Sequence, residues 1–405
     1  MARLKKRLSR LPFITVFLTL LVAVPLILAA VDAPTGFDDV TNGFENQTNF
    51  DLDRAQFDSI EQITDGLGPV YNAQACRECH QNPVSASSAQ FNEVRAGKLN
   101  SDGTFVDHPG GSLINDRAID AAIQEHVFDT DTIRTFRTSL NILGDGFVEA
   151  IPDSEFVRIF NAQPAGMKGG IVRVAALEAG PPSISTSRIA RFGWKDQHSS
   201  LLSFAADAYL NEMGITSPLF PTENTSNGNS VAAFDTVADP EDAATSANPF
   251  GPDVEAFTRF MRSTKAPPRG PIASDVGEAV FDRIGCQNCH TDSITTAPQG
   301  TSFNGGTFIV DASLGSKTIH PYGDFMLHDI QTGDGIVQAL TPGAYIRTAP
   351  LWGLRTRTRL MHDGQSLTIL DAINRHQGQA ATTVTAFNAL SATDKAALFD
   401  FLNSL

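Results

Sequence analysis

All four cysteines of this 405-residue chain fall in two copies of one short motif. The copies read Cys76-Arg-Glu-Cys79-His80 and Cys286-Gln-Asn-Cys289-His290. Two thiols at this spacing can bond the two vinyl groups of a haem, and the adjacent histidine can bind the iron from the same short helix. The sequence therefore predicts two covalently bound haem c groups, with the histidine of each motif as an iron ligand.

Other uses of paired cysteines fit less well. Zinc ribbons hold their cysteine pairs about 15–20 residues apart, whereas 206 residues separate Cys79 from Cys286. Disulfides are common in exported proteins, but no cysteine remains for one once both motifs bind haem. A thioredoxin-like pair needs a βαβ context, and neither motif sits in one.

The composition bears on partners and on stability. Apolar residues make up 41% of the chain, enough for substantial cores. The formal net charge is −15. Because phosphate binding needs a basic face, no nucleic-acid partner is expected, and a basic redox protein suits this charge better.

Residues 1–33 have the features of an export signal. Five basic residues precede an apolar run over 11–30, and Val31-Asp32-Ala33 follows. This order is typical of a secretory signal peptide, although a run of about twenty residues is also long enough for an N-terminal membrane anchor. In either case we expect the body of the protein to be periplasmic or otherwise exported. Without residues 1–30 the net charge would be −20.

The remaining chain divides at residues 266–271, a proline-rich stretch that we interpret as a linker. Before it we predict an N-terminal haem c domain with insertions, 34–265, and after it a C-terminal haem c domain, 271–405. The expected fold is mainly α, with two cytochrome c-like helical domains and long loops.

Apolar periodicity and capping patterns locate the helices. We predict helices over 116–127, 199–213 and 252–264, another from Asp275 into Cys286, and a last one that begins at Ser391. Residues 34–66, 96–113 and 221–250 are polar or rich in turn residues and are predicted to be irregular.

A faint repeat links the two halves. Val70-Tyr71 stands six and five residues before Cys76, and Val280-Phe281 stands at the same distances before Cys286. An aromatic side chain at this place can pack against a haem. The repeat predicts that the halves are two copies of one cytochrome c-like unit.

Several longer segments, such as Met361-His-Asp-Gly364, give the chain a family resemblance. It resembles the di-haem oxidoreductases related to the bacterial di-haem cytochrome c peroxidases over most of residues 60–405. The matching segments are 66–72, 143–153, 191–195, 212–217, 321–329, 347–353 and 361–364.

The resemblance implies roles for individual residues. In the peroxidases the N-terminal haem reacts with hydrogen peroxide, the C-terminal haem receives electrons, and a tryptophan lies between them; Trp194 takes that place here. Glu212 matches the catalytic acid, with Glu149 as a rival. The glutamine that precedes this acid in the peroxidases would fall near Phe204, so that part of their pattern is missing.

The resemblance also implies Met361 as the sixth ligand of the C-terminal iron, with His328 and His362 as alternatives. A thioether ligand raises the potential of a haem, which suits an electron-accepting site. For the N-terminal iron the candidates are His108 and His126, and an open sixth position would suit peroxide chemistry.

Thr348 and Pro350 match positions whose backbone oxygens help to bind an interdomain calcium ion in the peroxidases, and oxygen ligands suit calcium. The leading hypothesis is therefore a peroxidase-like enzyme that takes electrons from a small redox donor protein and passes them to a small oxidant such as hydrogen peroxide. The alternative is a non-enzymatic electron carrier in which both irons have six ligands.

Overall fold

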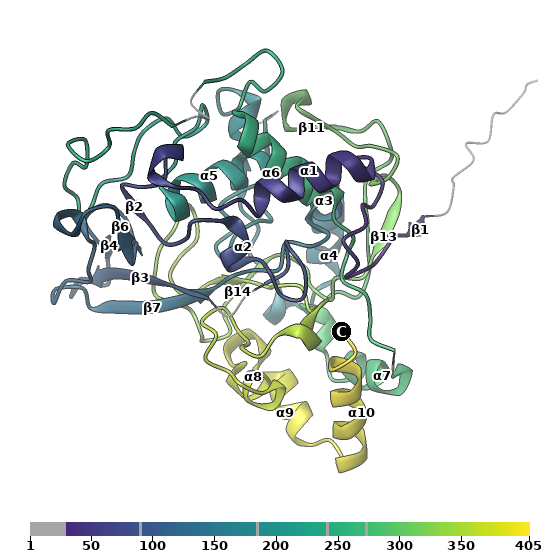
Figure 1. Cartoon of the computed structure of the whole chain (residues 1–405). Helices are drawn as coiled ribbons and strands as arrows, with labels where there is room; N and C mark the ends of the chain where they lie inside the picture. The colour runs from purple at the N-terminus through teal and green to yellow at the C-terminus, as the bar shows by residue number, and fades with distance from the viewer. Residues whose placement is uncertain (1–29, 89–90, 184–185, 240–242, 272–273) are drawn as a thin grey trace, which may run out of the picture.

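The computed structural model describes residues 30–88, 91–183, 186–239, 243–271 and 274–405 (Figure 1). In this part of the chain the fold is 31% helical and 16% strand, so it is a mixed α and β fold and the prediction of a mainly α protein is wrong. The helices are α1 (Gln47–Phe57), α2 (Cys76–Cys79), α3 (Asp145–Glu149), α4 (Asp153–Ala162), α5 (Leu201–Met213), α6 (Pro252–Ser263), α7 (Asp275–Arg283), α8 (Ile369–Arg375), α9 (Ala381–Asn388) and α10 (Ala392–Leu402).

The strands are short and form several small sheets. They are β1 (Val31–Asp32), β2 (Val70–Tyr71), β3 (Asn92–Leu99), β4 (Phe105–Asp107), β5 (Leu113–Ile114), β6 (Arg117–Ala118), β7 (Ile133–Thr138), β8 (Arg173–Ala175), β9 (Ser187–Ile189), β10 (Ile294–Thr295), β11 (Ser302–Phe303), β12 (Phe308–Ile309), β13 (Lys317–Ile319), β14 (Leu327–His328) and β15 (Ile346–Arg347). The largest sheet has four strands, with β3 bonded to β4, β5 and β7.

This four-stranded sheet explains much of the error in fold class. The Asp102-Gly103 pair, interpreted as part of a loop over 96–113, instead lies in the turn of the β3–β4 hairpin, a use typical of this pair. The predicted helix over 116–127 is replaced by β6 and a single 3₁₀ turn over Ala121–Ile123. The apolar residues of this segment pack in a small core with Val70 and Val231. They do not have to lie on one face of a helix to do so.

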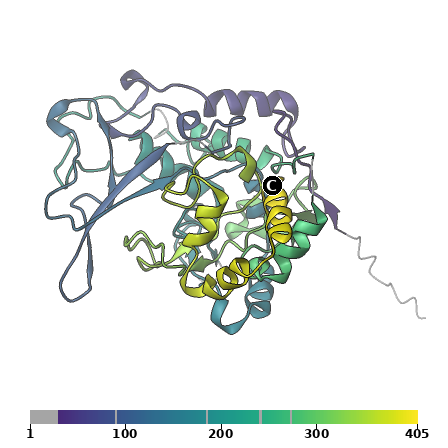
Figure 2. The ribbon, with the colours of Figure 1, turned by 90° about the horizontal axis from the view of Figure 1, so that it is seen from below.

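Two helix pairs support the two cysteine motifs. In the N-terminal half α1 packs against α6, and Phe57 of α1 lies 5.0 Å from Phe260 of α6 between ring centres. In the C-terminal half α7 packs against α10, and Phe281 lies 5.3 Å from Phe401 (Figures 1 and 2). Helix α1 was not predicted, since it lies in the polar stretch 34–66.

The predicted helices over 199–213 and 252–264 are present as α5 and α6, and those that begin near 275 and 391 are α7 and α10. Serine side chains cap both C-terminal helices, because Ser274 accepts a hydrogen bond from the backbone of Gly277 and Ser391 from that of Asp394. Gly277 also lets the two helices approach closely, since a Cβ there would meet the carbonyl oxygen of Ala397 at 2.0 Å.

Two of the hydrophobic cores in the described residues are much larger than the others. A smaller core joins α7, α9 and α10, with Phe387 and Leu398 among its buried residues. The larger one includes residues from α1, α3, α5 and α6 together with residues between 294 and 326. Segments on both sides of residue 270 therefore share one core, and the boundary between the two predicted haem c domains stays a prediction.

The export signal or anchor predicted for residues 1–33 lies almost wholly outside the described residues, which begin at residue 30. Val31 and Asp32 form β1 and pair in parallel with Lys317 and Thr318 of β13. Among the helices of the described residues, none combines the length and apolar character that a membrane crossing requires.

Candidate haem sites

Each cysteine motif opens onto a cavity, which we name the N-terminal and the C-terminal cavity. The N-terminal motif forms the single turn α2, and His80 ends it. The Nδ1 atom of His80 lies 3.1 Å from the backbone oxygen of Ser87, and burial lowers the pKa of the ring to about 4. The ring is therefore neutral at neutral pH, its Nδ1–H donates to that carbonyl, and Nε2 keeps its lone pair for a metal.

The C-terminal motif repeats this arrangement. A 3₁₀ turn over Cys286–Asn288 leads to His290, whose Nδ1 atom lies 3.0 Å from the backbone oxygen of Tyr322. Burial and the neighbouring His376 lower its pKa to about 4. Both predicted proximal histidines thus present a neutral ring whose Nδ1 atom is oriented by a backbone oxygen.

The donor sets and the space fit a haem at both places. The four cysteines, all within the described residues, form no disulfide. Burial raises the pKa of Cys76 and of Cys286 to about 12, so both free thiols are protonated at neutral pH. The N-terminal and C-terminal cavities contain about 1450 and 1440 Å³ of space free of protein atoms, including their open mouths.

The N-terminal cavity is polar because one face of a sheet lines it. Glu93 and Arg95 are two residues apart on β3, so they point to the same side of the sheet. Arg137 stands opposite Glu93 on β7 and completes this face. The Nε atom of Arg95 lies 2.7 Å from a carboxylate oxygen of Glu93, and all three side chains line the cavity.

Glu212 enters the same cavity from the last turn of α5. Its backbone oxygen accepts hydrogen bonds from Asn72 and Ala73, just before the N-terminal motif, which fixes the helix end beside that motif. Gly214 makes this contact possible, because it has φ +67° and a Cβ there would meet the backbone oxygen of Val70 at 2.6 Å. The Nδ2 atom of Asn72 donates to Glu212 at 2.8 Å.

Glu93 and Glu212 form an acid pair, because their carboxyl groups hydrogen-bond to each other. Burial and the charge of Glu93 raise the pKa of Glu212 well above its ordinary value. Burial also acts to raise the pKa of Glu93, but Arg95 outweighs it and the net direction is downward. The shared proton therefore resides on Glu212, and Glu93 stays ionised beside Arg95.

No second iron ligand is apparent in the N-terminal cavity. Among the described residues that line it, His80 is the sole histidine and there is no methionine. His108 is buried outside this lining, with its ring nitrogens 2.8 Å from Asp131 and 3.1 Å from Asn227. His126 is exposed and packs on Phe128.

Trp194 lines both cavities and is nearly buried. Its indole nitrogen donates to the backbone oxygen of Thr138 at 2.8 Å, and it packs with Leu140, Ile346 and Ala349. We call Trp194 and these three neighbours the wall. The side chain thus stands where the resemblance implies, between the two cavities.

A buried ionic network beside Trp194 stabilises the backbone that carries the wall. Lys195, next to Trp194, lies 2.9 Å from Asp334, and the Nε atom of Arg137 donates to the same carboxylate at 2.8 Å. Burial lowers the pKa of Lys195 to about 8, while Arg137 and Lys195 outweigh the effect of burial on Asp334 and lower its pKa. The network joins β7, the Trp194 turn and the loop around Asp334.

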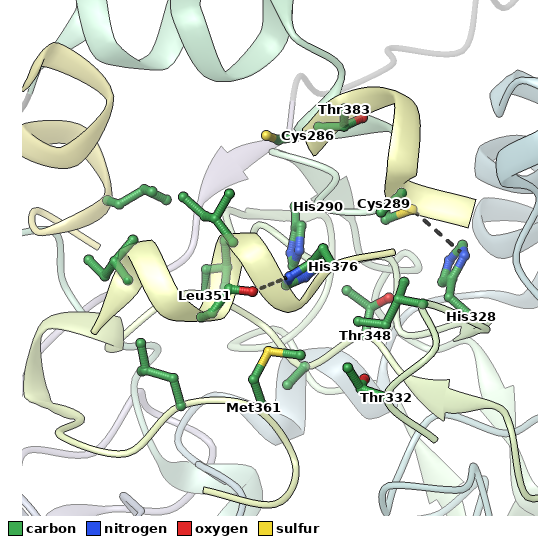
Figure 3. Close-up of a pocket in the computed structure, with 18 of the residues that line it drawn as sticks. Cys286, Cys289, His290, His328, Thr332, Thr348, Leu351, Met361, His376 and Thr383 are labelled. Atoms are coloured by element: carbon green, nitrogen blue, oxygen red, sulfur yellow. Dashed lines mark hydrogen bonds between the residues drawn. The ribbon is translucent and has the colours of Figure 1, made fainter. Parts of the chain in front are cut away.

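The C-terminal cavity is mostly apolar, and all three predicted ligand candidates line it. Figure 3 shows two of them, His328 and Met361. Met361 has φ +67°, a strained value for a residue with a side chain. The Nε2 atom of His328 lies 2.8 Å from Asp324, and despite burial that carboxylate raises the ring's pKa to about 10. His362 packs edge-on against Trp194.

The structure adds His376, for which no role was predicted. It follows the last residue of α8, lines the C-terminal cavity, and lies beside His290 in Figure 3. Glu93, Arg95 and Arg137 were also missed, because no strand was predicted over 92–99 or over 133–138. The alternation of charged and apolar residues over 93–96 is the strand signal that could have found Glu93 and Arg95.

Glu149, the rival acid, lies elsewhere. It is fully buried, lines neither cavity, and pairs with Arg262 at 2.7 Å. Burial alone would raise its pKa, but Arg262 more than offsets this and lowers it. Glu149 also accepts a hydrogen bond from the backbone of Leu201 at the start of α5, which is a structural use.

Thr348 and Pro350 both line the C-terminal cavity beside the wall. The one cluster of candidate metal-ligating side chains within the described residues is Cys289, Asp324 and His328, and it includes neither of them. Calcium usually takes six to eight oxygen ligands, so the calcium site stays a prediction.

A comparison with known protein families gives one match. Residues 112–405 match the family described as "Di-haem oxidoreductase, putative peroxidase", a range that contains the second cysteine motif and begins after the first. No curated protein sequence matches the chain.

Two solved structures have similar chains. One is Kuenenia stuttgartiensis hydrazine synthase, with 13% identity, 99% of each chain covered and a TM-score of 0.40. The other is a MauG-like protein associated with microbial copper homeostasis, with 14% identity, 95% of this chain and 94% of that chain covered, and a TM-score of 0.35. Both scores are below 0.5, so neither likeness supports a conclusion about mechanism.

Proposed function

Because this chain belongs to the di-haem oxidoreductase family, we propose that it is an exported enzyme with two haem c groups that reduces hydrogen peroxide or a similar small oxidant. Cys76 and Cys79 would hold the first haem and Cys286 and Cys289 the second. The export signal over residues 1–33 and the two cysteine motifs support this assignment.

The observation that carries the proposal is the difference between the cavities. The C-terminal cavity contains two methionines, Met167 and Met361, and further histidines besides His290. The N-terminal cavity contains an acid pair and two arginines, and its described lining has neither a second histidine nor a methionine. A polar cavity without a second protein ligand suits a small polar oxidant, whereas an electron carrier would need six ligands at both irons.

A bound haem would supply the redox chemistry for cleavage of a peroxide O–O bond. Glu212 holds a proton in the cavity and can give it to a leaving oxygen, as a general acid. Glu93, kept ionised by Arg95, can receive the proton that the other oxygen releases. Arg95 and Arg137 favour negative charge that develops between these carboxyl groups.

Electrons would come from a small redox donor protein, through the C-terminal haem and across the wall to the N-terminal haem. Trp194 supports this path, because it is the residue that lines both cavities with an aromatic ring. Calcium bound at Thr348 and Pro350 would stiffen the backbone beside the wall.

Electron spin resonance and absorption spectra of the oxidised and half-reduced protein test the proposal. An enzyme of this kind should show one high-spin iron that binds added cyanide and one low-spin iron, and it should consume peroxide with a reduced donor protein. Two low-spin irons in both states, with no peroxide turnover, would instead establish a di-haem electron carrier.

A further inference from the structure

We propose that His376 is the sixth ligand of the iron held by His290, in the place that the family resemblance gives to Met361. The proposal rests on the proposed function in one respect, the presence of a haem at Cys286 and Cys289. Nothing else in the assignment of a peroxidase depends on it.

The first observation is the spacing of the two rings. Metal–nitrogen bonds of about 2 Å, with roughly 1 Å from each nitrogen to its ring centre, place two imidazoles on opposite sides of one ion about 6 Å apart. The ring centres of His290 and His376 are 6.4 Å apart, with an angle of 54° between the rings. Both rings line the C-terminal cavity, so both border the space that a haem would fill.

The second observation is the hydrogen bond that orients His376. Its Nδ1 atom lies 2.7 Å from the backbone oxygen of Ala372, one turn earlier in α8. The carbonyl can only accept, so Nδ1 carries the proton and Nε2 has a free lone pair. His80 and His290 have the same arrangement with Ser87 and Tyr322. A backbone acceptor on the far nitrogen is the usual support of a metal-binding histidine.

The other candidates lack this combination. His328 has one ring nitrogen 2.8 Å from Asp324 and the other 3.7 Å from the sulfur of Cys289, so neither is free. The ring of His362 lies 6.1 Å from that of Trp194, on the wall. Met361 lies on a separate loop in Figure 3 and lines the same cavity, but its thioether has no N–H that a backbone oxygen could hold in one orientation.

The test uses the full-length holoprotein, with Met361→Ala as the matched variant of His376→Ala in the same cavity. A sulfur-ligated low-spin iron has a near-infrared absorption band that a bis-histidine iron lacks. We expect no such band in the unchanged protein and unchanged low-spin signals in Met361→Ala. His376→Ala should lose the low-spin signal of one iron, and added imidazole should restore it.

A variant that gains a spectroscopic band distinguishes a change of ligand from misfolding. His376→Met should keep two haems by pyridine haemochrome assay, acquire the sulfur band, and shift the potential of the low-spin haem upward, because a thioether raises it. A sulfur band in the unchanged protein that disappears in Met361→Ala would overturn the proposal. The absence of haem at the second motif would instead refute the proposed function, and the haemochrome assay separates the two results.

Discussion

The two haem motifs have similar proximal supports and unlike cavities. Phe57 packs 6.3 Å from His80, and Phe281 packs 6.2 Å from His290. Each phenylalanine also contacts a second one, Phe260 or Phe401, on the partner helix. On the other side of the histidines, one cavity has charged residues and the other has His376 and Met361. The phenylalanine pair and the proximal histidine thus fix where a haem can bind. The other residues that line the cavity determine which ligands and reactions are open to its iron.

The comparison also corrects the repeat proposed from the sequence. Phe57, not Tyr71, occupies the place that corresponds to Phe281. It stands 19 residues before Cys76, whereas Phe281 stands five residues before Cys286. Tyr71 belongs to β2 and pairs with Arg117 of β6. An insertion between helix and motif in the N-terminal half conceals the true correspondence from an alignment on the cysteines.

The largest expected effect tests whether both supports carry a haem. Replacement of Cys76 and Cys79 by alanine should leave one covalent haem, and the same change at Cys286 and Cys289 should leave the other. Pyridine haemochrome assay and the mass of the intact protein measure this. If either double variant kept two haems, its motif would not be a haem-attachment site, and the comparison of two haem supports would be wrong.

The next largest effect tests the polar cavity. Glu212→Gln removes the proton donor but keeps the size of the side chain and the hydrogen bond to Asn72. Since general acid–base groups contribute about 10²–10⁴-fold, peroxide turnover should fall at least tenfold while haem content and reduction spectra stay the same. Asp107→Asn, at the mouth of the same cavity, is the control. Equal loss in both variants would remove the special role of Glu212.

A third prediction concerns the wall that the two cavities share. Asp334→Asn leaves Lys195 and Arg137 buried without their carboxylate. Breaking a buried ion pair typically costs about 3–5 kcal/mol, so the free energy of unfolding should drop by that amount. Urea denaturation measures it, with exposed Asp311→Asn as the control. A loss like that of the control would show that the network does not hold the wall.

The sequence was most informative where chemistry requires fixed spacing. Each cysteine pair and its histidine are adjacent in the chain, and the structure puts both histidines beside cavities. Trp194 and Glu212 were assigned through the resemblance, because they lie on segments that match the family. The structure places both side chains in the lining of the N-terminal cavity, and their roles stay predictions. Helices α5, α6, α7 and α10 were predictable from capping residues and apolar periodicity alone.

The missed residues share a physical reason. Glu93 and Arg137 meet only because β3 and β7 pair, 44 residues apart in the chain, and strand pairing cannot be read from either strand alone. His376 meets His290 only because α8 folds over the C-terminal cavity. The mainly α prediction failed for the same cause, since turn residues within 96–113 were assigned to a loop rather than to hairpins.

A fourth prediction uses the pH dependence of the acid pair. The pKa of Glu212 lies above the model-peptide value of about 4.3, so the native protein holds this proton at pH values where the unfolded chain has lost it. Peroxide turnover that needs the proton should therefore fall as the pH rises through the raised pKa. Stability should also decline with rising pH over the same interval, because the native state binds more protons there.

The groups that face this pair are Arg95, Arg137 and Asp207, from β3, β7 and α5. Glu212→Gln should abolish the alkaline decline of whatever turnover remains, and turnover against pH in matched buffers measures it. A decline of the same shape in this variant would assign it to another group, such as an iron-bound water.

The smallest expected effect compares the helices that support the two motifs. Asn46 caps α1 by accepting from the backbone of Asn49, and Ser274 caps α7 by accepting from that of Gly277. Loss of such a cap costs about 1 kcal/mol, so Asn46→Ala and Ser274→Ala should each lower the free energy of unfolding by that amount, with exposed Ser101→Ala as the control.

The two variants should differ in whether they loosen the haem support next to the helix. Helix α7 ends three residues before Cys286, and at Gly277 it lies directly against α10, so fraying of its first turn is transmitted to the C-terminal haem support. Helix α1 ends 19 residues before Cys76 and is joined to the motif by a long segment. Hydrogen exchange should therefore show faster exchange around Cys286 in Ser274→Ala, and no change around Cys76 in Asn46→Ala. Equal changes in exchange at both motifs would mean that fraying of α1 reaches Cys76 despite the long segment between them.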